Sequence, residues 1–272
     1  MTGMVGGCDV GSTTGKAVLI ADGRIVGSAV IASLVDPEQT AKEALRAAGA
    51  SVPGWAQGQR LDYLIGTGYG RNEVPFADEN VSEITCHAVG AHWCNPSVRT
   101  IIDVGGQDVK AVGLNADGTV REFAMNDKCA AGTGRFFEAM SRILRVDLEN
   151  FSDLSSRATR VIPITSQCSV FAETEVVSLI GKRHAASDIA AGVQAAVAKR
   201  IFSLVKRVGL EPVVTMTGGC AHNAGLVEAV SKVLRAEIVR VTVDPQIVGA
   251  LGAAVLAERR WRGPRGQAGG RS

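Results

Sequence analysis

Apolar residues recur every three to four positions in several segments of this 272-residue chain, and that spacing predicts amphipathic helices. The longest such segment runs from Ile189 to Val208 and stops before Gly209, a residue type that commonly ends helices. A second segment runs from Phe136 to Leu144. Two more helices are expected at about 170–180 and 249–260.

Short apolar runs between these segments predict strands. PVVTMT, from Pro212, indicates a buried strand that leads through a Gly-Gly bend to a helix opening near Asn223. EIVRVTV, from Glu237, indicates another strand. Because strands and helices alternate, we expect an α/β fold.

Two segments of the chain repeat the same pattern. DVGSTTGKAVLIADGRIV starts at Asp9 and DVGGQDVKAVGLNADGTV starts at Asp103, so that Asp103 corresponds to Asp9 and Lys110 to Lys16 at an offset of 94 residues. In each, a strand reaches a glycine turn, a second strand leaves it, and an Asp-Gly pair turns the chain into a third strand. The repeat predicts two lobes of one design.

The lobes are expected to divide near residue 100. The first lobe takes residues 1–100 and the second takes residues 101–245. The closing helix, at about 246–260, is expected to pack back on the first lobe, and the Gly/Arg-rich residues 261–272 are expected to form a disordered tail.

Composition narrows the class of protein. Hydrophobic residues make up 46% and charged residues 21%, with a net charge of +2 and no long basic stripe, which argues against nucleic acid as a partner. No apolar run is long enough to span a membrane, and the N-terminus does not resemble an export signal. We therefore expect a cytoplasmic protein whose six cysteines are thiols or metal ligands and not disulfides.

The glycine turns have the composition of phosphate-binding loops. Glycine lets backbone N–H groups approach phosphate oxygens, and an aspartate beside each turn, Asp9 or Asp103, suits Mg²⁺. A third glycine pair, in MTGG, suits a purine or ribose. The candidate nucleotide-binding residues are Gly11, Ser12, Thr13, Lys16, Gly105, Gly106, Gly218 and Gly219.

Neither of two common nucleotide motifs fits these turns. Only three residues separate Gly11 from Gly15, and Ala17 stands where a Walker A loop requires Ser or Thr. GTGRFF, from Gly132, has Phe137 at the last glycine position of a dinucleotide-binding fingerprint. The spacing thus excludes both motifs.

Two cysteines precede predicted helices. Cys129 comes just before AAGTGR, and Cys168 just before the helix at about 170–180, where a helix N-terminus would favour anionic sulfur. Two buried apolar thiols are the alternative. Two ligands are too few for a tetrahedral zinc or 4Fe–4S site in one chain, but a two-fold dimer would supply four. The cysteines and histidines of CHAVGAHWC, from Cys86, fit no usual zinc spacing, so a packed or interface helix is expected there.

These motifs resemble those of a known superfamily. DVGSTTGK, DVGGQD and VVTMTGGCAHN are similar to the two phosphate motifs and the adenosine motif of the actin, Hsp70 and sugar-kinase ATPases. The resemblance implies two RNase H-like lobes with ATP in the cleft between them. It leaves the substrate open, because this fold serves many functions.

A longer series of motifs points to one branch of that superfamily. In chain order, TGYGRN, SEITCHA, IIDVGGQDVK, MNDKCAAGTGRF, SQCSVFAE and MTGGCAHN resemble the ATPase components that activate 2-hydroxyacyl-CoA dehydratases and the ATPase subunits of benzoyl-CoA reductases. The resemblance covers about residues 5 to 257. It implies a dimer, of one chain or of two related chains, that shares one 4Fe–4S cluster, and it assigns Cys129 and Cys168 as ligands.

The same resemblance implies an electron pump. Ferredoxin or flavodoxin would reduce the cluster, and ATP hydrolysis at Asp9 and Asp103 would let one electron pass to a CoA-thioester dehydratase or reductase. Gln107 is the expected orienter of the attacking water, and Glu173 and Glu175 are expected to complement a helix dipole. Two alternatives stay open: a small-molecule kinase for a sugar or acyl acceptor, and a non-enzymatic ATP-switched scaffold or metal sensor.

Overall fold

The computed structural model describes residues 3–56, 59–126, 128–166 and 168–263. They form two compact units. Unit 1 contains the described residues up to Pro96, the turn Asp117–Thr119 and those from Thr242 onward. Unit 2 contains Ser97–Ala116 and Val120–Val241.

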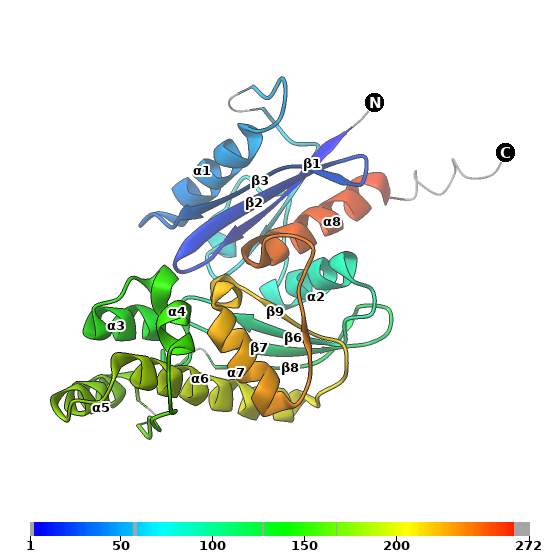
Figure 1. Ribbon diagram of the computed structural model, residues 1–272. Helices are drawn as coiled ribbons and strands as arrows, with labels where there is room; N and C mark the ends of the chain where they lie inside the picture. Colours follow the sequence, from blue (N-terminus) through cyan, green and yellow to red (C-terminus); the bar gives the residue numbers. More distant parts are fainter. Residues whose placement is uncertain (1–2, 57–58, 127, 167, 264–272) are drawn as a thin grey trace. The chain divides into compact units, whose positions relative to one another are not determined.

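Unit 1 is a mixed five-stranded sheet with helices packed on it (Figure 1). The strand order is β3-β2-β1-β4-β5. Its strands are β1 (Met4–Val10), β2 (Thr14–Ala21), β3 (Arg24–Ala32), β4 (Tyr63–Thr67) and β5 (Glu79–Asn80). Its helices are α1 (Pro37–Gly49), α2 (Glu83–Cys94) and α8 (Val248–Arg262). α8 lies against β1 and β4, and it approaches so closely that a Cβ atom at Gly7 would lie 2.1 Å from the Ala250 carbonyl oxygen.

Unit 2 repeats this design. Its strand order is β10-β9-β6-β7-β8. Its strands are β6 (Thr100–Val104), β7 (Val109–Leu114), β8 (Val120–Asn126), β9 (Val214–Thr217) and β10 (Ile238–Val239). Its helices are α3 (Gly134–Leu144), α4 (Phe151–Ser156), α5 (Ser169–Gly181), α6 (Ala186–Val208) and α7 (Ala224–Leu234). Short 3₁₀ helices in the two units span Arg71–Glu73, Leu148–Asn150, Gly219–His222 and Pro245–Ile247.

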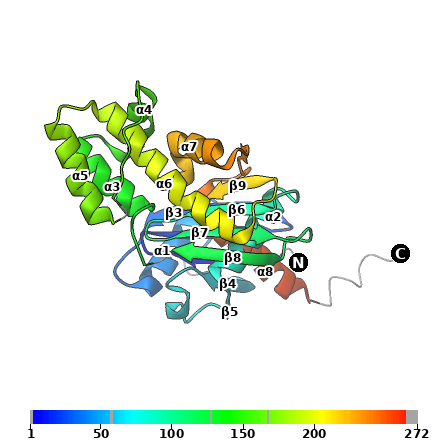
Figure 2. The same ribbon diagram turned by 90° about the horizontal axis from the view of Figure 1, so that it is seen from below.

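The helices of unit 2 form one apolar core with its sheet. α6 lies against β7 and β8, and α3 and α5 pack on each other beyond one end of the strands (Figure 2). Phe136 and Phe137 of α3 are buried, and the Phe137 ring meets that of Phe151 edge-on at a centroid distance of 5.4 Å. This packing anchors the start of α3 beside the end of β6.

The predicted repeat is confirmed by the strand pairing. β1 pairs antiparallel with β2 and parallel with β4, and β6 pairs in the same way with β7 and β9. The registers match as well, since Asp9 faces Lys16 and Asp103 faces Lys110. The α/β fold with two sheets is therefore as predicted.

Two sequence expectations need correction. The strand expected from Glu237 is only Ile238–Val239, because it pairs at the sheet edge with β9 alone and the chain then leaves the ladder. Cys129 does not stand at a helix start. A turn in which the Thr133 amide donates to the Ala130 carbonyl (3.0 Å) delays α3, whose N-cap residue is Thr133.

α2 is a packed helix, as expected of CHAVGAHWC. Cys86 and His87 are buried, and α2 meets α8 so tightly that a Cβ atom at Gly252 would collide with the Cys86 carbonyl oxygen. Across the described ranges, no three His, Cys, Asp or Glu side chains are grouped so as to hold a metal ion. None of the described helices is both long and apolar enough for a membrane span. Residues 264–272, most of the expected tail, lie outside the described residues, and α8 continues to Arg262.

Candidate functional site

Each unit buries an aspartate–lysine pair at the end of its central strand. In unit 1, Lys16 Nζ lies 3.2 Å from Asp9 Oδ2. In unit 2, Lys110 Nζ lies 3.3 Å from Asp103 Oδ2 and 2.8 Å from Asp108 Oδ2. The two aspartates are only 5% and 4% exposed, so these charges depend on their partners.

The predicted phosphate-binding turns follow these aspartates. In unit 1 the Gly11 amide donates to the Thr14 carbonyl (3.1 Å), which closes the turn and leaves Ser12 exposed. In unit 2 the Gly105 amide donates to the Asp108 carbonyl (3.0 Å), and Gln107 is exposed.

The start of α3 is joined to the second turn. The amides of Gly134 and Arg135 donate to the carbonyls of Gly105 and Gly106, each at 2.9 Å. The backbone of this turn is therefore held by the helix that follows the cysteine loop of unit 2.

A threonine followed by a glycine completes each group, and neither threonine was among the residues predicted from the sequence. Thr217 Oγ1 donates to Asp103 Oδ1 at 3.0 Å, and Gly218 follows with φ 82°. A Cβ atom at Gly218 would lie 2.8 Å from that same carboxylate oxygen, so only glycine fits. Thr67 and Gly68 stand at the equivalent place in unit 1, and a Cβ atom at Gly68 would lie 2.3 Å from Asp9 Oδ1. In the sequence, both pairs are visible as a Thr-Gly dipeptide in which the threonine is the last residue of β4 or β9.

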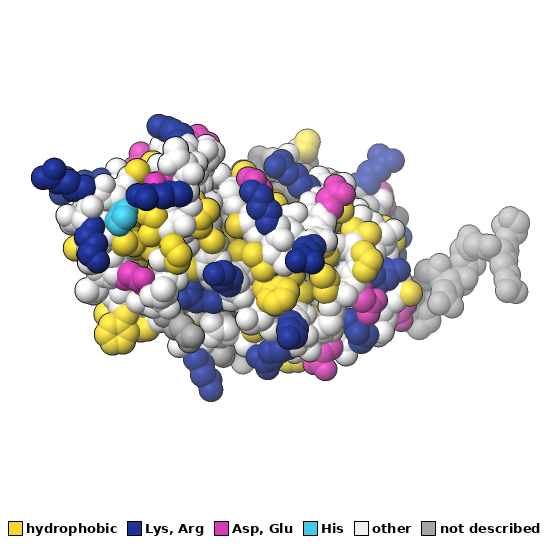
Figure 3. All heavy atoms as spheres, turned by 60° about the horizontal axis from the view of Figure 1, so that its bottom comes forward, with side chains coloured by type: hydrophobic (Ala, Val, Ile, Leu, Met, Phe, Trp, Pro, Cys, Tyr) yellow, Lys and Arg dark blue, Asp and Glu magenta, His cyan; other side chains and the backbone are white. Residues whose placement is uncertain are grey.

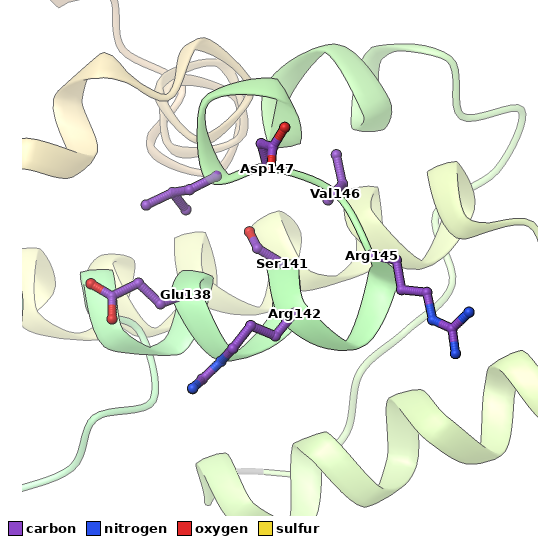
Figure 4. Close-up of a pocket in the computed structure, with 7 residues that line it drawn as sticks. Glu138, Ser141, Arg142, Arg145, Val146 and Asp147 are labelled. Carbon is purple, nitrogen blue, oxygen red and sulfur yellow. The ribbon is translucent and has the colours of Figure 1, made fainter.

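A pocket of about 480 Å³ lies farther along α3. It is lined by Glu138, Ser141, Arg142, Arg145, Val146, Asp147 and Leu148. Figure 4 shows Ser141 pointing from α3 toward the segment that carries Asp147. Ser141 is 5% exposed, and its hydroxyl makes no hydrogen bond in the structure. The pocket thus holds a buried polar group that a ligand could satisfy.

The pocket adjoins the glycine turn after β9. A Cβ atom at Gly134 would lie 3.7 Å from Cys220 Sγ, and the pKa of Cys220 is raised first by burial, then by Asp103 and by the pocket residue Glu138. α3 therefore connects the Gly105–Gly106 turn, the Gly218–Gly219 turn and the pocket within unit 2.

Four of the six cysteines are poor candidates for metal ligands. Burial raises the pKa of Cys86 and of Cys220 to about 12, and it also raises the pKa of Cys8 and of Cys94. Cys8, Cys86 and Cys220 are buried inside their units, so they are not available to a metal shared with a second chain, and Cys94 ends α2 in unit 1.

The other two cysteines lie on loops at the α3–α5 end of unit 2. Cys168 is exposed and is the N-cap residue of α5, and Cys129 is partly buried. Both loops touch Arg200 of α6. Its Nη2 donates to the Ser166 carbonyl at 2.8 Å, and its Cδ lies 3.5 Å from where a Cβ atom of Gly132 would be.

A 4Fe–4S cluster requires four thiolates, and this end of the chain presents two of them. The thiols of Cys129 and Cys168 are of the ligand type that such a cluster requires, and they would supply two of its four ligands. A second chain with the same two cysteines would complete it.

Glu175 holds the loop before Cys168, which corrects its expected role at the helix dipole. Its carboxylate accepts hydrogen bonds from the Thr165 amide (3.0 Å), the Thr165 hydroxyl (2.9 Å) and the Ser166 amide (2.9 Å). Burial alone would raise the pKa of Glu175, but the backbone and side-chain hydrogen bonds from Thr165 and Ser166 outweigh it and lower the pKa from 4.5 to about 2. Glu175 therefore fastens this loop to α5.

Replacing Glu175 by alanine should loosen this loop. Because hydrogen bonds to a charged acceptor are lost but the site is partly open to solvent, we expect the Thr165 and Ser166 amides to exchange hydrogen about five- to tenfold faster at neutral pH. Glu173→Ala, two residues earlier on α5, is the matched control. Since the pKa is lowered in the folded state, the protection in the unaltered protein should be complete above pH 4.5 and fade as the pH falls toward about 2. Equal exchange in both variants would contradict the assignment.

The two sheets match in topology, and each carries an aspartate–lysine pair beside a glycine turn. The structure is similar at the level of the fold to a glucokinase of the ROK family from Streptomyces griseus, with a TM-score of 0.57 at 14% identity over 94% of this chain and 100% of that one. The chain belongs to the BadF/BadG/BcrA/BcrD ATPase family, which it matches over residues 7–257. The predicted family resemblance is thereby confirmed.

Two relatives are much more similar. The activator of lactoyl-CoA dehydratase from Anaerotignum propionicum is 43% identical over 255 residues, which cover 92% of this chain and 96% of the relative. A solved structure, the activator of the 2-hydroxyisocaproyl-CoA dehydratase from Clostridium difficile with bound ADPNP, has a TM-score of 0.90 at 39% identity and covers 100% of this chain and 99% of that one.

Proposed function

We propose that this ATPase is an iron–sulfur electron donor that drives single low-potential electrons into a CoA-thioester enzyme. The acceptor is a 2-hydroxyacyl-CoA dehydratase or a benzoyl-CoA reductase. The observation that carries the proposal is the convergence of the Cys129 and Cys168 loops on one arginine, in a chain that belongs to an ATPase family.

The phosphate groups of ATP are bound by the glycine turns. The amide of Gly106 and the side chains of Ser12, Thr13 and Lys16 contact phosphate oxygens, and Gly11 and Gly105 carry no side chain that would block the approach of the phosphates. Asp9 and Asp103 hold Mg²⁺, directly or through its waters, which suits carboxylates that lie beside such turns. Gln107 is exposed on its turn, as an orienter of the attacking water has to be.

The nucleoside lies along α3. Gly218 and Gly219 approach the ribose with bare backbone, and Glu138 accepts hydrogen bonds from ribose hydroxyls. Ser141 and Arg142, one turn farther from the phosphate-binding turn, contact the purine in the pocket of Figure 4. Support comes from the continuity of α3 with the Gly105–Gly106 turn and from the buried, unsatisfied Ser141 hydroxyl.

Cys129 and Cys168 hold half of a 4Fe–4S cluster, and a second copy or a related subunit holds the other half. When bound, the cluster would carry one electron at a time. Next to Cys168, α5 exposes Val170 (65%), Phe171 (69%) and Val177 (57%), an apolar face of the kind that a subunit interface covers. Figure 3, in which the bottom of Figure 1 is turned toward the viewer, shows hydrophobic side chains and Lys or Arg side chains next to one another on this face.

The remaining partners follow from this role. A reduced ferredoxin or flavodoxin supplies the electron, and the nucleotide-dependent state of the turns at Asp9 and Asp103 controls when it leaves. Such an oxygen-sensitive centre fits a cytoplasmic protein.

The proposal is tested by purifying the protein under strict anoxia. We expect a brown protein with about four irons per dimer, whose bleaching by an acceptor enzyme requires ATP hydrolysis. A colourless protein that transfers phosphate to a sugar or acyl acceptor would instead support the kinase alternative. A colourless protein that binds ATP without turnover would support the scaffold alternative.

A further inference from the structure

Arg200 lies within α6. The hydrophobic periodicity of this helix does not by itself indicate a function for Arg200. It is partly buried, and three neighbours hold its side chain. The guanidinium donates to the Ser166 carbonyl at 2.8 Å, two residues before Cys168. The carbon atom between its nitrogens lies 5.8 Å from the centroid of the Phe136 ring in α3, and its Cδ lies 3.5 Å from where a Cβ atom of Gly132, three residues after Cys129, would be.

One cation therefore lies beside two segments that are distant in sequence from each other and from Arg200, one with Gly132 and Phe136 and one with Ser166. Burial lowers the pKa of the Arg200 guanidinium, and the nearby Cys129 opposes that shift, so Cys129 is within electrostatic reach. An arginine stays charged under these conditions. The cation is thus permanently present beside both cysteine loops.

We propose that Arg200 is a positioning residue that holds the Cys129 and Cys168 loops together and sets the reduction potential of the cluster they share. This inference rests on the proposed function. Reduction adds one negative charge to the cluster, and a fixed positive charge next to it favours the reduced form. Arg200 therefore makes the cluster easier to reduce by its electron donor.

Arginine makes one contact here that lysine cannot make. The planar guanidinium can lie over the Phe136 ring and still donate to the Ser166 carbonyl, whereas a lysine ammonium is a compact charge without a flat face. The two roles of Arg200 can therefore be separated by substitution. Arg200→Lys keeps the charge and gives up the stacking, and Arg200→Met keeps the stem and gives up both.

The test is an anaerobic redox titration of the full-length protein, followed by electron paramagnetic resonance, with iron content measured in parallel. Arg207→Met is the matched control, because Arg207 lies seven residues farther along α6 and is exposed. For Arg200→Met we expect the ratio of reduced to oxidised cluster at a fixed potential to fall about tenfold, a shift of about 59 mV for one electron. Arg200→Lys should restore most of that ratio, and Arg207→Met should match the unaltered protein.

The outcomes separate this inference from the proposed function. An unaltered protein without a cluster would overturn both. A cluster whose potential is the same in Arg200→Met and in the unaltered protein would overturn only the role of Arg200. Loss of iron from Arg200→Met alone, with Arg200→Lys still loaded, would support the holding of the loops. Loss of iron from both variants, together with a lower melting temperature of the iron-free protein, would overturn the proposal, since packing against Phe136 would then explain it.

Discussion

Cys168→Ser should abolish the brown colour of the anaerobically purified protein, with iron falling from about two atoms per chain to near zero. Serine has almost the same size as cysteine but presents a hydroxyl, which does not replace a thiolate on iron. Because the proposed cluster is shared across a two-fold axis, one substitution in the gene removes two of four ligands. Cys129→Ser should have the same effect. Iron analysis and the visible spectrum measure it.

Cys94→Ser is the matched control for these substitutions. Cys94 ends α2 in unit 1, is partly buried, and lies outside the two cysteine loops. It should leave both iron content and colour unchanged. If the colour survives in Cys168→Ser and in Cys129→Ser, the cluster is bound elsewhere and the proposed function loses its basis.

Asp103→Asn should reduce ATP hydrolysis by about 100-fold or more, the range that loss of one preorganised electrostatic contact costs in kcat. The amide keeps the shape of the carboxylate and its bond from Thr217, but it removes the charge that faces Lys110 and would face Mg²⁺. The fold should survive, because Lys110 keeps its 2.8 Å ion pair with Asp108. Phosphate release under saturating ATP and Mg²⁺ is the measurement.

Two control measurements are needed to interpret the result for Asp103→Asn. Asp117→Asn, in the exposed turn between β7 and β8, should hydrolyse ATP normally. Thermal unfolding of Asp103→Asn should show a folded protein. Full activity in a folded Asp103→Asn variant would show that this carboxylate does not act in hydrolysis, and the metal site would have to be sought in unit 1.

The sequence was most informative where local pattern and fold agree. The repeat at an offset of 94 residues predicted that Asp103 corresponds to Asp9 and Lys110 to Lys16, and the matching registers of the two hairpins agree with it. Long helices such as α6 could be predicted for the same reason, since their apolar periodicity persists over many turns.

Features that depend on tertiary contacts could not be predicted. Nothing near Arg200 in the sequence points to Ser166, which lies 34 residues away and meets it only after α5 and α6 have packed. From the sequence, Glu175 was expected only to interact with the helix dipole. Its partners Thr165 and Ser166 lie before α5, and the sequence does not show that this loop reaches Glu175. The strand from Glu237 was overestimated because apolar alternation does not reveal how many residues find a ladder partner at a sheet edge.

The buried aspartate–lysine pairs have a consequence for how ligands enter. Lys16 balances the charge of Asp9, and Lys110 is shared by Asp103 and Asp108, so an arriving phosphate that attracts either lysine leaves an unbalanced carboxylate behind. A divalent ion that binds together with the phosphate supplies positive charge both to the aspartate that the lysine has left and to the phosphate itself. Metal and nucleotide are therefore expected to strengthen each other's affinity, and either one alone should bind weakly.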